Sequence, residues 1–221
     1  MIVPARFNGP PDSGNGGYTC GLVAAELGVS GAEVTLRAPP PLETEMTVER
    51  DGDSVRVSSG DTLVAEGRPA EVDVGELPAP VTPDEAAEVV AAGRERWFAG
   101  HPFPTCFVCG PDRDDGMDIF PVAHGDRFVA TWTPSEAGIT WPALDCPTSA
   151  PVMNPDKDPP IVLARLAAAI DDEPEIGEPH VLVSWELGRE GRKRDSACVL
   201  YDAGGRPLAR SRALWIELRQ E

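Results

Sequence analysis

The sequence has no apolar run of about 18 residues, the length that a membrane-spanning helix needs. Residues 1–7 also lack the basic segment and the apolar stretch of a secretory signal. We therefore expect no membrane partner and predict a cytoplasmic protein. Aromatic residues make up only 6%, but 41% of the 221 residues are apolar and 25% are charged, which is a globular composition.

Positive charge is scarce, with 19 Lys and Arg against 37 Asp and Glu and a formal net charge of −18. Such a charge repels a phosphate backbone, so we expect no nucleic-acid partner. Any anionic ligand needs a local basic patch. The candidate patch consists of Arg189, Arg192, Lys193 and Arg194. Both the binding of an anionic group and a solvated hairpin tip fit this pattern.

Cysteine is present in an odd number, five, which together with the missing signal favours a reducing compartment and free thiols. Cys106 and Cys109 have the spacing of half a zinc site. A structural zinc ion needs four ligands, usually including a second close pair. Neither Cys146 nor Cys198 has a cysteine or histidine neighbour at ligand spacing. We therefore predict packed free thiols and no metal, with a zinc site as the alternative.

The two ends of the chain resemble each other at a shift of 144 residues. The matching pairs are Gly60 and Gly204, Val64 and Leu208, Ala65 and Ala209, Arg68 and Arg212, Val72 and Ile216, and Val74 and Leu218. Both copies alternate apolar and polar residues around a glycine turn. This pattern predicts an antiparallel hairpin in each copy.

The repeat also decides the interpretation of residues 163–170, which are rich in alanine. Helix propensity alone favours a helix there. However, residues 161–170 are followed by Pro174 and a predicted strand, as residues 34–37 are followed by three prolines and a strand. We therefore predict a strand rather than a helix.

A helix is predicted before each set of strands. In the first copy, Asn15 and two glycines lead into a helix over residues 18–27. In the second copy, a short helix is predicted to begin at Asp145 or Cys146, with Pro147 in its first turn.

Residues 82–85, Thr-Pro-Asp-Glu, have the spacing of a capping box, which predicts a connecting helix over residues 84–97. After it, residues 105–108, 117–122 and 127–133 are predicted strands. The order of elements in each copy fits an antiparallel sheet wrapped around one central helix.

Four segments resemble the hotdog-fold superfamily in its double form, with two units in one chain. Residues 106–110, Cys-Phe-Val-Cys-Gly, resemble the opening of phenylacetate-pathway-type thioesterase-like proteins. Residues 15–18, Asn-Gly-Gly-Tyr, resemble the turn that starts the central helix of acyl-CoA thioesterases with this fold. Residues 144–148 and 188–193 resemble segments of uncharacterised bacterial thioesterase-like proteins.

This resemblance implies an α+β double hotdog. The expected units are residues 1–77 and 101–221, joined by a helical linker at residues 78–100. The two sheets are expected to pair edge to edge into one continuous antiparallel sheet, with both central helices on its concave side. A homodimer of such chains is compatible with this arrangement.

The resemblance also implies acyl-thioester chemistry, with a coenzyme A thioester as substrate and no separate cofactor. The first amides of a helix are unpaired and carry partial positive charge, so they can stabilise the oxyanion that forms on a thioester carbonyl. One such donor is worth about 3 kcal/mol of barrier. Gly17 is the expected donor, and Asn8 and Asn15 are expected to position the reactants.

The sequence departs from the family at the catalytic acid. Related thioesterases carry an aspartate or glutamate two turns into the helix, where this chain has Ala24. Because paired units place each site between two helices, the substitute can come from the other copy. Asp145 is the expected carboxylate, Thr148 a candidate hydroxyl, and Trp141 a candidate wall of an acyl pocket.

Three functions remain open at this point. The first is hydrolysis of an acyl thioester. The second is binding of acyl-CoA or a lipid metabolite by a chain that keeps the fold without a catalytic base. The third is a structural role in a larger complex.

Overall fold

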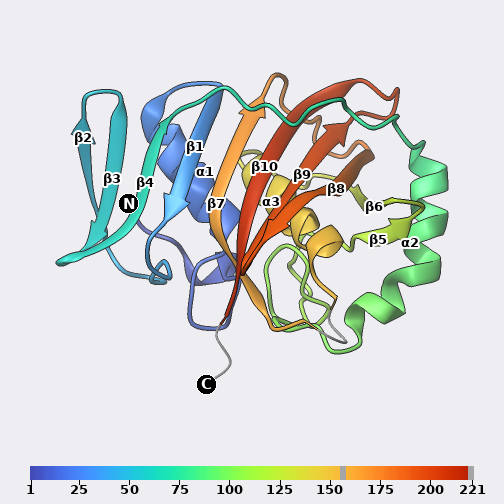
Figure 1. The fold of residues 1–221 in the computed structure, drawn as a ribbon, viewed down its shortest axis with the longest axis horizontal. Coiled ribbons are helices and arrows are strands. Elements are labelled where there is room, and N and C mark those ends of the chain that lie inside the picture. Colours follow the sequence, from blue (N-terminus) through green and yellow to red (C-terminus); the bar gives the residue numbers. More distant parts are fainter. Residues whose placement is uncertain (155–157, 219–221) are drawn as a thin grey trace.

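The computed structural model describes residues 1–154 and 158–218. Their strands form one sheet in the order β2-β3-β4-β1-β7-β10-β9-β8-β6-β5, with every adjacent pair antiparallel (Figure 1). The first half contributes η1 Ala5–Phe7, α1 Gly16–Leu27, β1 Gly31–Leu36, β2 Thr47–Asp51, β3 Ser54–Ser59 and β4 Thr62–Pro69. The second half contributes β5 Val122–His124, β6 Arg127–Trp132, α3 Thr140–Asp145, η2 Cys146–Val152, β7 Ile161–Ile170, β8 His180–Glu190, β9 Lys193–Tyr201 and β10 Pro207–Glu217. The connecting helix is α2 Pro83–Phe98.

The two halves of the sheet join through β1 and β7, which pair antiparallel with Val34 opposite Leu166. Both side chains are fully buried. The predicted continuous sheet is therefore confirmed, and the fold is an α+β double hotdog.

The alanine-rich strand β7 lies at this junction and is hydrogen-bonded on both sides, to β1 and to β10. Successive side chains of a strand point to opposite faces. Ala168 accordingly shares a buried cluster with Leu144 of α3, while Ala167 and Ala169 pack in another cluster with Val72. Because both faces of β7 are covered, burial overrides the helix propensity of its alanines. The segment is therefore a strand, as the repeat predicted.

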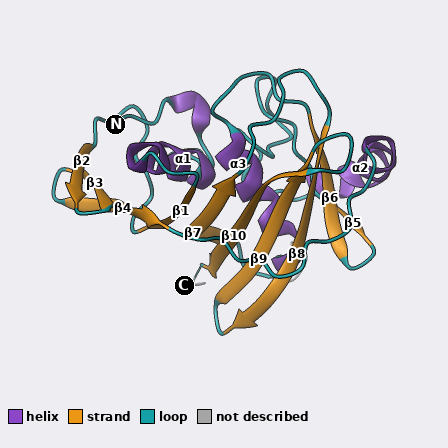
Figure 2. Cartoon of the chain, turned by 90° about the horizontal axis from the view of Figure 1, so that it is seen from above, coloured by secondary structure: helices purple, strands orange, loops and turns teal. Residues whose placement is uncertain are grey.

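The helices α1 and α3 lie on the same face of the sheet (Figure 2). The helix α1 begins as predicted, because Oδ1 of Asn15 accepts the N–H of Tyr18 at 2.9 Å. It ends at Gly28, whose φ of 67° is a left-handed conformation that glycine adopts without strain. The connecting helix α2 is capped in the same way by Thr82.

One local prediction was wrong, and another was right in part. Residues 105–108 and 117–121 are turns and loops rather than strands, and among the described residues the strands of this region are β5 and β6. The predicted short helix is present as η2, which begins at Cys146 with Pro147 in its first turn, but α3 precedes it from Thr140 and Asp145 makes no capping hydrogen bond with its side chain. No described side chain caps the start of α3, and its last turn is packed in the core, where Ala143 and Leu144 are completely buried.

None of the helices in the described part of the chain has the length and hydropathy needed to cross a membrane.

Candidate functional site at the junction of two helices

The first turn of α1 meets the last residue of α3. The backbone N–H of Gly17 donates to Oδ2 of Asp145 over 2.7 Å. The first amides of an α-helix have no partner within the helix and carry partial positive charge. The carboxyl group of Asp145 therefore satisfies one of these amides from the other half of the chain.

Asp145 is only 1% exposed, and its environment is unusual for a carboxyl group. Burial raises the pKa of Asp145 to about 8, and the nearby Cys106 adds to this effect, whereas the Gly17 amide opposes it. Its second oxygen, Oδ1, has no hydrogen-bond partner among the described residues. A buried carboxyl group with an unused oxygen is typical of functional sites.

Glycine at position 17 is required by the close approach of the two helices. A Cβ atom there would lie 2.4 Å from Cβ of Asp145 and 2.8 Å from Cα of Pro142. One turn along α1, a Cβ on Gly21 would lie 2.9 Å from Cβ of Trp141. The small residues of α1 thus let α3 pack against its backbone.

The polar side chains next to this junction form hydrogen bonds with neighbouring residues. The amide nitrogen of Asn15 lies 3.6 Å from Sγ of Cys146 and 3.8 Å from Sγ of Cys106. The hydroxyl of Thr148 donates to the backbone oxygen of Asp145 at 2.5 Å and accepts from Nε1 of Trp215 at 2.8 Å. Asn15 therefore caps α1, and Thr148 holds the backbone of Asp145.

The side chain of Asn8 forms its hydrogen bonds with residues outside the junction. Its side-chain nitrogen donates to the backbone oxygen of Thr105 at 3.1 Å, and its side-chain oxygen accepts from Arg113. Asn8 thus ties the N-terminal segment to the loop that precedes Cys106.

The predicted basic patch lies at the β8–β9 hairpin, and its cations bond to residues outside the junction of α1 and α3. Arg189 pairs with Glu186 at 2.7 Å and Lys193 with Glu190 at 3.8 Å. The remaining two cations both bind Glu217, Arg194 through the carboxylate and Arg192 through the backbone oxygen at 3.0 Å. Each positive charge of the patch therefore already has an oxygen partner.

A cavity of about 520 Å³ lies along the same pair of helices, one turn beyond Gly17 and Asp145. Its walls include Gly21, Ala24, Thr140 and Trp141. Ala24, the position at which the resemblance implies a catalytic acid, thus borders an open space of the size that small molecules occupy. Gly17 and Asp145 are not among the residues that line it.

A second cavity of about 440 Å³ lies between α2 and η2. Aromatic, cationic and sulfur-containing side chains contribute to its walls, among them Trp97, His101, Phe128, Met153 and Arg189. Arg189 is thus the one member of the basic patch that borders this space.

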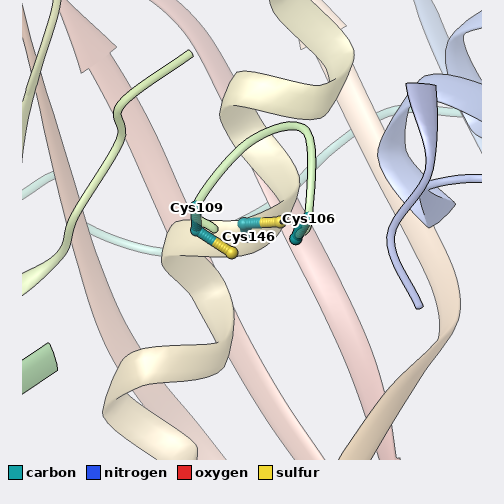
Figure 3. Close-up of side chains that lie close together, drawn as sticks. All are labelled: Cys106, Cys109 and Cys146. Carbon is teal, nitrogen blue, oxygen red and sulfur yellow. Dashed lines mark hydrogen bonds between the residues drawn. The ribbon is translucent and has the colours of Figure 1, made fainter. Parts of the chain in front are cut away.

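Sequence reasoning missed a cluster of three buried thiols beside the junction. The sulfur atoms of Cys106, Cys109 and Cys146 all lie within 4.8 Å of one another (Figure 3). Cys146 follows Asp145 directly, whereas the other two cysteines come from a distant loop. Nothing in the spacing of Cys146 along the chain indicates this arrangement, because the fold alone brings the loop and η2 together.

No family model and no curated protein matches the sequence. Solved structures do match. The tesB protein of Mycobacterium avium subsp. paratuberculosis has a TM-score of 0.62 at 11% identity, over 99% of this chain and 91% of that chain. A protein of unknown function with a hot dog fold from Alicyclobacillus acidocaldarius has a TM-score of 0.63 at 13% identity, over 99% and 92%.

An acyl-CoA thioesterase II, TesB2 from Mycobacterium marinum, has a TM-score of 0.59 at 11% identity, over 95% of this chain and 91% of that chain. At such low identities the likeness concerns the fold and not the activity. The likeness spans nearly the whole chain in each case. The strands of both halves of this chain also pair into one sheet. The chain is therefore a double hotdog protein.

Proposed function

We propose that the protein hydrolyses acyl thioesters at the junction of α1 and α3. The observation that carries this proposal is the 2.7 Å contact between the amide of Gly17 and the carboxyl group of Asp145. It brings a helix-terminal donor and a buried carboxyl group to one point. An oxyanion donor and a general base are the two groups that thioester hydrolysis requires.

In the proposed reaction, the thioester carbonyl oxygen replaces Oδ2 of Asp145 on the Gly17 amide. Because the pKa of Asp145 is raised to about 8, the released group acts as a base in the fraction that is deprotonated, which grows as the pH rises towards 8 and above. This carboxylate takes a proton from a water molecule as the oxygen of that water bonds to the carbonyl carbon. Negative charge then moves to the carbonyl oxygen, where Gly17 stabilises it. The carbon–sulfur bond breaks, and the proton passes from Asp145 to the departing thiolate, which yields a carboxylic acid and a free thiol.

The acyl group has a place in the cavity beside Trp141 and Ala24, because this space begins one helical turn from the reacting groups. Coenzyme A is the proposed carrier. Of the basic patch, Arg189 is the candidate contact for its phosphates, since its side chain borders the second cavity. The acyl-CoA thioesterase among the matching folds supports this choice of substrate class.

Binding without hydrolysis is the second candidate function, and two observations favour it. Ala24 stands where related enzymes carry their acid, and the Gly17 amide is already bound by Asp145. If the carboxyl group never leaves this amide, no donor is available to a substrate. The chain would then hold an acyl thioester in the cavity without cleaving it.

A panel of acyl-CoA substrates from short to long chains tests the proposal, with chromatography to measure released coenzyme A. We expect turnover by the native protein and a loss of about 100-fold or more in Asp145→Asn, the scale of effect for general-base catalysis. Asp126→Asn is the matched control, because the side chain of Asp126 is 89% exposed. Binding by calorimetry without release of coenzyme A would overturn hydrolysis in favour of the second candidate. Full activity in Asp145→Asn would remove the proposed base.

A further inference from the structure

Three cysteine side chains meet in the interior between a loop and the second central helix (Figure 3). Cys106 and Cys109 belong to the loop, and Cys146 begins η2. All three are buried and none forms a disulfide. The sulfur atoms of Cys106 and Cys146 are 3.9 Å apart, and all three sulfurs lie within 4.8 Å of one another.

This spacing suits a single metal ion. Zinc–thiolate bonds are about 2.3 Å long, so two sulfurs on one tetrahedral zinc ion lie about 3.8 Å apart. The Cys106–Cys146 separation of 3.9 Å already matches that value. Ligation of the third sulfur requires a movement of less than about 1 Å, which a change of side-chain torsion supplies.

The loop that carries Cys106 and Cys109 is a tight turn, which fixes where the two thiols lie. The amide of Gly110 donates to the backbone oxygen of Cys106 at 2.9 Å, which closes a tight turn. A Cβ on Gly110 would lie 2.5 Å from both the nitrogen of Cys106 and the oxygen of Pro104, so only glycine fits.

Cysteine binds metal as a thiolate, and hydrogen-bond donors lie close to these sulfurs. The side-chain nitrogen of Asn15 is one such donor, next to two of the sulfurs. A buried thiolate without a cation is costly, because its charge is removed from water.

We propose that Cys106, Cys109 and Cys146 bind one thiophilic metal ion of the Zn²⁺ class, which fastens the Cys106–Cys109 loop to the start of η2. Soft thiolate ligands select zinc and copper(I) over magnesium or calcium. In this proposal the three thiolates are the protein ligands and a water molecule is the fourth ligand. The site is independent of whether the α1–α3 junction hydrolyses thioesters.

The test begins with the full chain purified under a phosphine reductant, stripped with chelator and then incubated with Zn²⁺. Elemental analysis after gel filtration is expected to find stoichiometric zinc in the native protein. Single serine variants of Cys106, Cys109 and Cys146 are expected to retain at least about tenfold less zinc than the native protein. Cys198→Ser is the matched control and is expected to retain zinc, because Cys198 is equally buried but lies outside the cluster.

Two measurements on the native protein keep the proposal testable if a variant fails to fold. Co²⁺ is expected to give the thiolate-to-cobalt charge-transfer band of a sulfur-rich site, and Zn²⁺ is expected to raise the thermal unfolding midpoint of the stripped protein. No bound zinc, no charge-transfer band and no change in this midpoint would overturn the proposal. A disulfide between two of the three cysteines in freshly purified protein, detected by mass spectrometry, would also overturn it.

Discussion

The amide of Gly17 and the carboxyl group of Asp145 are joined by a 2.7 Å hydrogen bond across the junction between the two hotdog units. Gly17 lies in the first turn of α1, and Asp145 is the last residue of α3. The bond is buried and the two backbones are so close that no side chain fits at position 17. The same contact thus contributes to the packing of the two units and to the chemistry proposed for them.

Replacement of Gly17 by alanine is expected to destabilise the protein by about 1–3 kcal/mol, the usual cost of overpacking a core. The added methyl group would lie 2.4 Å from Cβ of Asp145, so α1 and α3 must separate. Urea denaturation measures the free energy of unfolding. Gly188→Ala is the control, because a Cβ there meets nothing within 4 Å. Equal stability of both variants and the native protein would contradict the close contact.

Two substitutions of Asp145 are expected to differ in stability. Asp145→Ala leaves the Gly17 amide buried without a partner, which costs about 1–3 kcal/mol. Asp145→Asn keeps a side-chain oxygen that accepts from this amide, so its free energy of unfolding should lie closer to that of the native protein. Chemical denaturation of the three proteins measures the difference. An alanine variant as stable as the asparagine variant would show that the hydrogen bond contributes nothing.

The ion pair of Arg194 with Glu217 joins β9 to β10 in the second unit, and the two side chains are only 10% and 15% exposed. Arg194→Ala leaves the carboxylate of Glu217 without this partner in a largely buried place, so we expect a loss of about 3–5 kcal/mol. Arg192→Ala removes only a bond to the backbone oxygen of Glu217 and should cost much less. Thermal or urea denaturation of the two variants measures the loss of stability in each. Similar losses in both would contradict the buried ion pair.

Asp202 closes the turn between β9 and β10 and makes stability depend on pH. The amides of Arg206 and Gly204 donate to its Oδ1 at 2.8 and 3.0 Å. The Arg206 amide is the first of the contacts that lower the pKa of Asp202 below its ordinary value. Its contribution is therefore complete above the unfolded pKa, which is about 4, and is lost as the pH falls through the lower folded pKa.

The stability difference between native protein and Asp202→Ala should therefore be largest near neutral pH and shrink in acid. Urea denaturation at several pH values measures this difference. A difference that stays constant across the acid range would show that the charge of Asp202 has no part in holding the turn.

The internal repeat was the most informative feature of the sequence. It predicted β7 against the helix propensity of its alanines, because the same order of elements occurs around β1. It could not predict the loop at residues 105–108. Phe107 and Val108 are buried there as an apolar strand would be, but burial alone does not determine whether a backbone pairs with a neighbouring strand.

The candidate site was only partly accessible to sequence reasoning. The resemblance brought Gly17 and Asp145 together as candidates, because paired units place a site between two helices. It did not predict that Thr148 bonds to the backbone of Asp145 and to Trp215, or that Asn8 bonds to Thr105. Such contacts depend on loops and side-chain rotamers, for which the sequence carries no periodic signal.

The central claim is that the Gly17 amide leaves Asp145 to bind a thioester carbonyl. The direct measurement is the nuclear magnetic resonance signal of the Gly17 amide during titration with a ketone analogue of acyl-CoA, in which a methylene group replaces the thioester sulfur. We predict a saturable shift of the Gly17 signal in parallel with signals from residues of the cavity beside Trp141. A Gly17 signal that stays unchanged while the cavity signals show saturation would contradict the claim.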